Sequence, residues 1–165
     1  VTAVVDAYRD DGLTVTIERQ YDTFARLTVT DADRVSKVEL GVDWRANEPI
    51  LMAIGPVLHP DDAVANKMSA LYGRALARDF IDIDATLQSG RYTQETLLTL
   101  AQRADRGFDR RIFADALGQA DQLDPDDFTQ YGLTDPALND LRSRFSAWRR
   151  ELLDRQHTAV DDSVK

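Results

Sequence analysis

The pattern of apolar and polar positions changes along the chain, from short alternating segments in the first third to helical spacing in the rest. Residues 1–10 place apolar side chains three and four apart, which predicts a helix that ends near Gly12. The segments 13–18, 24–29 and 35–42 then alternate with period two and are rich in β-branched residues. We therefore expect a short helix followed by an antiparallel meander, with a polar turn at 31–33.

A stretch containing proline and glycine, 46–60, separates this part from a helical remainder. Its apolar segment 50–54 predicts a short edge strand. Helices are expected at about 61–72 and 75–88, with Gly73 as a kink or stop, and four more are expected to start at Thr93, Asp109, Asp124-Pro125 and Asp135-Pro136. The last, about 136–155, carries a seam of apolar residues at steps of three and four: Leu138, Leu141, Phe145, Trp148 and Leu152.

The resulting fold class is α+β, a partial antiparallel sheet followed by a C-terminal helical bundle. The expected division is 1–58 for the α/β part, 59–155 for the helical domain and 156–165 for a flexible, polar tail. The chain has 165 residues, which is enough for one domain with a substantial core or for two small halves.

Composition narrows the function classes. Apolar content is 43% and charged content 30%, no apolar run approaches the length of a membrane span, and no signal peptide opens the chain, so a cytoplasmic protein is expected. The absence of cysteine excludes disulfides, thiolate metal sites and a cysteine nucleophile, and the two histidines lack zinc-ligand spacing. A net charge of −9 argues against broad non-specific binding of nucleic acid. Two groups of arginines are predicted to be solvated helix faces: Arg103, Arg106, Arg110 and Arg111, and Arg142, Arg144, Arg149 and Arg150.

The segment 66–84 concentrates charge among apolar residues. Lys67 is placed on an apolar helix stripe by its spacing to Val64 and Leu71, and Asp79 and Asp82 share a helix face. Charges on partly buried helix faces are costly unless they are paired or used. Two interpretations follow. The first is a structural ion-pair cluster in a non-enzymatic interaction domain, and the second is a polar cleft that handles a phosphate.

Glu39 is a further candidate, because period two places it on the less apolar face of the strand 35–42. That face is either plain solvent-facing surface or the polar side of a cleft above the sheet. A carboxylate on a sheet followed by a helical lysine is compatible with metal-assisted nucleotidyl transfer, in which carboxylates hold magnesium and lysine neutralises triphosphate charge.

Three segments together carry a family resemblance: K-V-E-L-G-V-D-W-R, G-P-V-L-H-P-D-D-A-V-A-N-K-M-S-A-L-Y-G-R and A-R-D-F-I-D-I-D. They resemble the AbiEii/AbiGii toxin family of nucleotidyltransferases, over roughly residues 13–120. In that family K-x-x-A-L-x-x-R leads into R-D-x-x-D, and the matching residues here are Lys67, Ala70, Leu71, Arg74, Arg78, Asp79 and Asp82.

The resemblance implies a polymerase-β-like nucleotidyltransferase fold, Mg²⁺, a nucleoside triphosphate, a cognate antitoxin, and RNA such as tRNA as acceptor in some members. Carried over by position, the catalytic residues are Glu39, Lys67, Asp79 and Asp82, the nucleotide-binding residues are Lys67, Arg74 and Arg78, and the metal ligand is Glu39.

The sequence departs from the family at the motifs that carry most of the metal binding. Neither the glycine-rich turn nor a D-x-D on a strand occurs before Glu39. We therefore expect this chain to be the C-terminal part of such an enzyme, inactive by itself, because metal and phosphate charge would be uncompensated. An exposed sheet edge would then be available for a homodimer.

Overall fold

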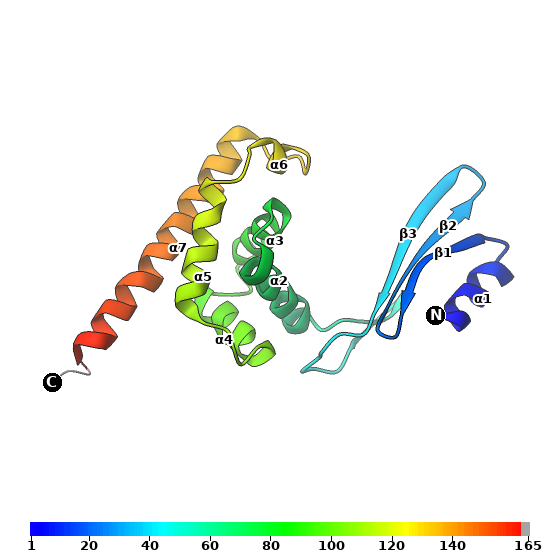
Figure 1. Ribbon diagram of the computed structural model, residues 1–165, viewed down its shortest axis with the longest axis horizontal. Coiled ribbons are helices and arrows are strands. Elements are labelled where there is room, and N and C mark those ends of the chain that lie inside the picture. The colour runs from blue at the N-terminus through cyan, green and yellow to red at the C-terminus, as the bar shows by residue number, and fades with distance from the viewer. Residues whose placement is uncertain (163–165) are drawn as a thin grey trace. The chain divides into compact units, whose positions relative to one another are not determined.

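The structure is a computed structural model that describes the backbone of residues 1–162 and the side chains of residues 1–154. The chain divides into two compact units, Val1–Trp44 and Arg45–Lys165, which are described separately. An antiparallel sheet in the first unit and a helical bundle in the second confirm the predicted α+β class (Figure 1).

The first unit consists of helix α1 (Thr2–Asp10) and strands β1 (Thr14–Tyr21), β2 (Phe24–Asp31) and β3 (Arg34–Gly41). The strands pair antiparallel in the order β1-β2-β3, as the alternating segments predict. Val5 of α1 is buried together with Val15, Leu27 and Val29 from one face of the sheet. The opposite face is the more exposed one, because successive side chains of a strand point to opposite sides.

The turn between β2 and β3 contains a strained residue, since Ala32 has φ +51°. A left-handed backbone costs a residue with a Cβ atom roughly 1–2 kcal/mol, whereas glycine adopts it readily. We expect Ala32→Gly to stabilise the first unit by about 0.5–1 kcal/mol in urea denaturation followed by circular dichroism. Ala7→Gly, in the exposed interior of α1, is the control with the opposite sign. A lower free energy of unfolding in Ala32→Gly would show that the backbone of Ala32 is not strained.

The second unit opens with a small hairpin, in which β4 (Ile50–Met52) pairs with β5 (Gly55–Val57). The strand predicted at 50–54 is thus confirmed over its first three residues. Strand β5 escaped prediction because Pro56 argues against a strand, yet proline is tolerated at the edge of a two-stranded sheet.

Seven helical segments follow the hairpin in the described residues, up to 162. They are α2 (Pro60–Arg74), α3 (Ala77–Gln88), α4 (Gln94–Ala104), α5 (Arg110–Leu117), the 3₁₀ helix η1 (Gly118–Asp121), α6 (Asp126–Thr129) and α7 (Asp135–Asp162). The Thr93 and Asp109 side chains cap α4 and α5 as predicted. Gly73 does not stop its helix, because α2 continues to Arg74. Of the predicted tail 156–165, helix α7 includes residues up to 162, and 163–165 lie outside the described residues.

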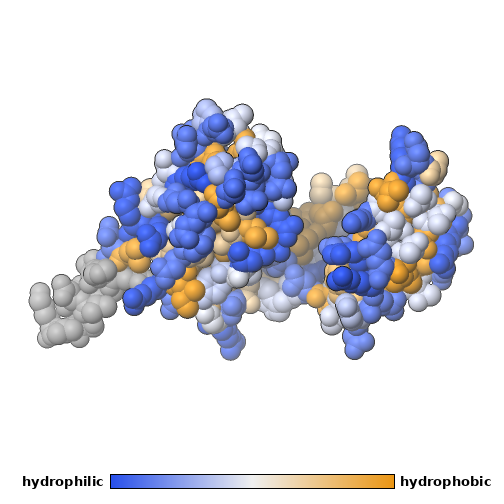
Figure 2. Space-filling model, turned by 45° about the horizontal axis from the view of Figure 1, so that its top comes forward, coloured by the Kyte–Doolittle hydropathy of each residue, from blue (hydrophilic) through white to orange (hydrophobic). Residues whose placement is uncertain are grey.

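The core of the second unit forms around α7, which lies along α5 in Figure 1. The predicted seam is confirmed, because Leu138, Leu141, Phe145, Trp148 and Leu152 are all buried. Phe113 and Phe80 meet this seam edge-on, with ring centroids 5.2 Å from Trp148 and 5.1 Å from Phe145. Edge-to-face aromatic pairs add to the free energy of burial. The face shown in Figure 2 is mostly hydrophilic, with hydrophobic residues in small groups between polar ones.

The arginines of α7 correct the expectation of a solvated face. Arg142 donates from Nε to the carbonyl of Ala120 (2.9 Å) and from Nη2 to that of Leu123 (2.8 Å). Arg149 donates to the carbonyl of Ala114 (3.1 Å). These side chains add hydrogen bonds to carbonyls in the last turn of α5, at the end of η1 and just after it. None of the helices that the structure describes is long and apolar enough to cross a membrane.

Candidate nucleotide-binding site at the junction of α2 and α3

The charged residues predicted for the site lie mainly around a sharp turn between α2 and α3. Helix α2 ends at Arg74, its C-cap residue Ala75 adopts the left-handed conformation (φ +47°, ψ +49°), and Leu76 is the N-cap residue of α3. The chain therefore reverses within two residues. This brings the last turn of α2, with Arg74, next to the first turn of α3, with Asp79.

Asp79 is fully buried in this junction. Its carboxylate accepts two hydrogen bonds from Arg74, Nε to Oδ2 (2.9 Å) and Nη2 to Oδ1 (2.8 Å), and a third from the backbone N–H of Leu76 (3.1 Å). Burial acts to raise the pKa of Asp79, but the hydrogen bonds from Arg74 and Leu76 and the charges of Arg74 and Arg78 outweigh it and lower the pKa. The hydrogen bond to Asp79 likewise raises the pKa of Arg74. Asp79 thus fixes the turn as an ionised cap of α3.

Lys67 and Asp82 form a second bridge between the same two helices, with 2.7 Å between Nζ and Oδ2. The Lys67 side chain is 50% exposed, so its placement on the apolar stripe was wrong. Three helical steps turn Lys67 by about 60° from Val64, to the border of the stripe that Val64 and Leu71 bury. Asp82 is 38% exposed, whereas Asp79 is fully buried. A ligand can therefore reach the carboxylate of the Lys67–Asp82 pair but not that of the Arg74–Asp79 pair.

The remaining candidates differ in their surroundings. Arg78, one residue before Asp79, is exposed and has no ion pair within the described part of the chain. Glu39 lies in the first unit, on the exposed face of β3, where its carboxylate accepts from Arg26 Nε (2.8 Å) and pairs with Nη2 (2.7 Å). Of the predicted set, the structure brings together Lys67 with Asp82 and Arg74 with Asp79.

The carboxylates do not provide a ready magnesium site. Among residues 1–154, whose side chains are described, no group of three or more His, Cys, Asp or Glu side chains could hold a metal ion. Magnesium requires oxygen donors in near-octahedral arrangement. Glu39, Asp79 and Asp82 instead each face a cation, and the Asp79 carboxylate already accepts three hydrogen bonds. As arranged, these donors do not fit Mg²⁺.

The comparison with protein families decides the identity. A match to the family described as "Nucleotidyl transferase AbiEii toxin, Type IV TA system" covers residues 3–165. The chain belongs to the AbiEii toxin family. No curated protein and no solved structure matches it. Family membership implies nucleotidyl transferase chemistry, an NTP substrate and an antitoxin partner.

In this AbiEii-family chain, the charged motif has a clear structural effect. Lys67 and Arg74 on α2 pair with Asp82 and Asp79 on α3, so that the motif fixes the angle between consecutive helices. Leu71, between the two cations, is fully buried. The structure also answers which acid is accessible, since Asp79 is enclosed and Asp82 is partly exposed.

Some residues of the AbiEii chain escaped sequence reasoning. Buried Asp62 in the first turn of α2 accepts hydrogen bonds from the N–H groups of Ala46 (3.1 Å) and Asn47 (3.0 Å) and from the Asn47 amide (3.1 Å). A hollow of about 240 Å³ lies between Arg78 and Tyr131. The consecutive acids after Pro60 signalled a helix start, but no local pattern indicates contacts across the fold.

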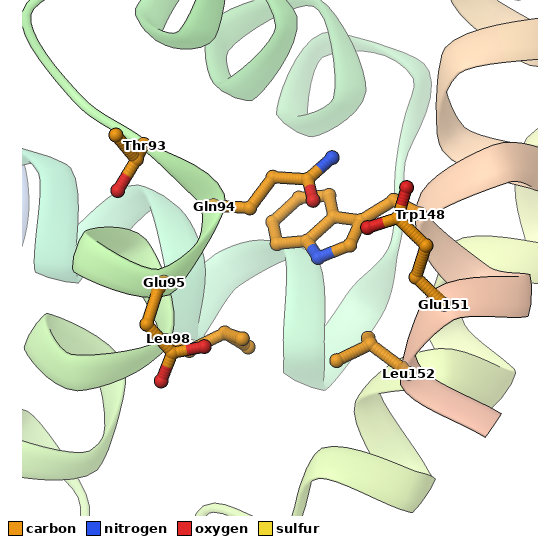
Figure 3. A pocket seen from close by; sticks show the side chains of 7 residues that line it. All are labelled: Thr93, Gln94, Glu95, Leu98, Trp148, Glu151 and Leu152. Atoms are coloured by element: carbon orange, nitrogen blue, oxygen red, sulfur yellow. The ribbon is translucent and has the colours of Figure 1, made fainter. Parts of the chain in front are cut away.

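Another hollow, of about 310 Å³, lies between the start of α4 and the helix α7 and contains none of the predicted site residues. Figure 3 shows the Gln94 side chain beside the indole of Trp148. The carboxylate of Glu95, at its edge, is engaged by Arg110 (2.6 Å and 3.2 Å). The residues that line this hollow therefore contribute no charge to the AbiEii motif at the junction of α2 and α3.

Proposed function

We propose that this chain is part of a cytoplasmic toxin–antitoxin nucleotidyltransferase, which transfers a nucleotide from an NTP to an RNA acceptor such as tRNA. The observation that carries the proposal is the family match over residues 3–165 together with the ordered charged motif at the junction of α2 and α3. The nucleotide would bind where the motif leaves cations accessible.

Lys67 is the residue best suited to contact the triphosphate. Its side chain is half-exposed, and its ammonium group is held by one partly exposed carboxylate, that of Asp82. Exposed ion pairs contribute about 0–1 kcal/mol, so exchanging Asp82 for a phosphate costs little. Arg74 lies two helical turns from Lys67 on the same face of α2 and is 47% exposed. Asp79 acts as a positioning residue in this scheme, because it holds Arg74 and does not face the ligand.

Nucleotidyl transfer in this family uses Mg²⁺, which, when bound, stabilises the charge that develops on the phosphates. Because Glu39, Asp79 and Asp82 do not fit the metal as arranged, we assign no metal-dependent step to them. The proposal is that these 165 residues contribute triphosphate contacts and that transfer requires carboxylates beyond these three. The chain alone should then bind nucleotide without transferring it.

Lys67→Ala is expected to weaken binding of a nucleoside triphosphate at least tenfold, because a phosphate loses its principal cation. The fold should persist, with a change below about 1 kcal/mol in the free energy of unfolding, since the pair with Asp82 is half-exposed. Isothermal titration with ATP and GTP, with and without magnesium, measures binding, and urea denaturation measures stability.

Lys37→Ala is the matched control, because it removes the same charge from an exposed position on β3. It should leave both binding and stability unchanged. If Lys67→Ala and Lys37→Ala bind nucleotide equally well, the site assignment is wrong.

The second candidate function is a non-enzymatic interaction domain, and the mutual pairing of four of the five motif charges is the observation that favours it. In that case no nucleotide binds to the native chain, and the motif only sets the angle between α2 and α3. Pairing of two copies through an outer strand of the β1-β2-β3 sheet belongs with this candidate. The titration above separates the two candidates.

A further inference from the structure

The hollow between the first turn of α3 and the α6 segment has an unusual lining. One wall carries Arg78, which has no ion pair among the described residues. The opposite wall carries Tyr131, whose side chain is 51% exposed and forms no ring pair in the described part of the chain. Asp127 lines the same wall, and its carboxylate has no hydrogen-bond partner within the described residues. An aromatic face, a guanidinium and a free acceptor thus surround one space.

Both walls are fixed in place. On the α3 side, the bond from Leu76 N–H to the Asp79 carboxylate holds the first turn (3.1 Å). On the other side, Phe128 is fully buried, and the Leu123 carbonyl is held by Arg142 (2.8 Å). Gly132, with φ +82°, turns the chain directly after Tyr131. A ligand would therefore meet a preorganised space, which lowers the entropic cost of binding.

The volume of the hollow and the charges that line it indicate which class of ligand it can bind. Its volume of about 240 Å³ lies below the ~300–1,000 Å³ of pockets that enclose whole small molecules. Its lining contains one cation, Arg78, with Asp127 on the opposite wall, which suits one phosphate and not a triphosphate. Exposed aromatic rings beside an arginine stack unpaired bases, and a carboxylate accepts from base amino or imino groups. The lining therefore suits a ligand with one base and one phosphate.

We propose that this hollow binds one nucleotide of a single-stranded RNA, with Tyr131 stacked on the base, Arg78 on the phosphate and Asp127 at the base edge. The assignment deepens the proposed function, on which it rests for the choice of RNA, because the hollow would hold the acceptor strand. It is distinct from the Lys67 contact to the triphosphate, which lies on the other end of the α2–α3 charged motif.

The test is fluorescence anisotropy of a short labelled oligoadenylate RNA with the full 165-residue chain at several salt concentrations. Tyr131→Leu should weaken binding about 5- to 100-fold, whereas Tyr131→Trp should retain it, because stacking requires a ring. Arg78→Ala should reduce the slope of log K against log salt by about 0.7, as expected when one phosphate contact to a single strand is lost. Tyr21→Leu and Arg19→Ala, both exposed on β1, are the matched controls.

Equal binding by the native chain, Tyr131→Leu and Tyr21→Leu would overturn the proposal, and so would an absence of oligonucleotide binding. Binding of free AMP as tight as that of the oligonucleotide would assign the hollow to free nucleotides and would also overturn it. The Lys67 titration fails or succeeds separately, since it measures triphosphate binding. Tyr131-dependent RNA binding without any NTP binding would therefore reject the transferase proposal and keep this site.

Discussion

Replacing Arg74 with alanine is expected to lower the free energy of unfolding of the second unit by about 3 kcal/mol, near the low end for breaking a buried ion pair. Asp79 is fully buried, and without the guanidinium its carboxylate keeps one hydrogen bond, from Leu76 N–H. The low end applies because Arg74 is 47% exposed, so water replaces part of its contribution. Urea denaturation at pH 7 measures the loss. Trp148 fluorescence reports the second unit in a Trp44→Phe background, which leaves one tryptophan.

The destabilisation by Arg74→Ala should shrink as the pH falls. In the native chain the folded pKa of Asp79 lies below its ordinary value of 3.8, so the stabilisation is complete above about pH 4 and is lost as the pH falls through the folded pKa. In the variant, only the hydrogen bond from Leu76 and the charge of Arg78 still oppose burial, so we expect the folded pKa of Asp79 to rise above that of the unfolded chain. Protonation of Asp79 near pH 4 therefore removes the unpaired buried charge in the variant. The loss in free energy of unfolding caused by Arg74→Ala should be smaller at pH 4 than at pH 7.

Arg78→Ala is the control for Arg74→Ala, because it removes an exposed arginine that has no ion pair in the described part of the chain. It should change the free energy of unfolding by no more than about 0.5 kcal/mol. A deficit for Arg74→Ala that is the same at pH 4 and pH 7, or that equals the deficit for Arg78→Ala, would show that the pair with Asp79 does not stabilise the junction.

The sheet was predictable because period two assigns each side chain to a face. Val38 and Leu40 pack against the small core of the first unit, and Glu39 between them faces outward, as the alternation predicts. The caps Thr93 and Asp109 were predictable for a similar local reason, since a side-chain oxygen bonds to an N–H two or three residues ahead.

The charged junction was predictable as a set and not pair by pair. Helical spacing indicated that charges of 66–84 share faces, but the left-handed turn at Ala75 decides that Arg74 meets Asp79. Alanine carries no signal for that conformation, which glycine usually provides. The placement of Lys67 failed because three helical steps from an apolar position turn a residue by about 60°, which put Lys67 at the edge of the apolar stripe.

Asp62 shows the limit of local reasoning more clearly, and its replacement by alanine is the second large effect that we expect. Its buried carboxylate accepts three hydrogen bonds from Ala46 and Asn47, sixteen and fifteen residues earlier in the chain. Hydrogen bonds to a charged group contribute about 1.5–3 kcal/mol each, but the freed donors lie where water can reach them in part. Asp62→Ala should therefore lower the free energy of unfolding by about 2–3 kcal/mol in the same urea assay.

The loss should also be local, because Asp62 ties the segment before β4 to the first turn of α2. Hydrogen exchange of the Ala46 and Asn47 amides should become faster in Asp62→Ala than in the control Asp61→Asn, which removes the same charge from the same turn. Burial acts to raise the pKa of Asp62, but the hydrogen bonds from Ala46 and Asn47 lower it below the ordinary value. The difference in free energy of unfolding between the native chain and Asp62→Ala should therefore persist above about pH 4 and decrease below it. Unchanged exchange at Ala46 and Asn47 would show that Asp62 does not hold this segment.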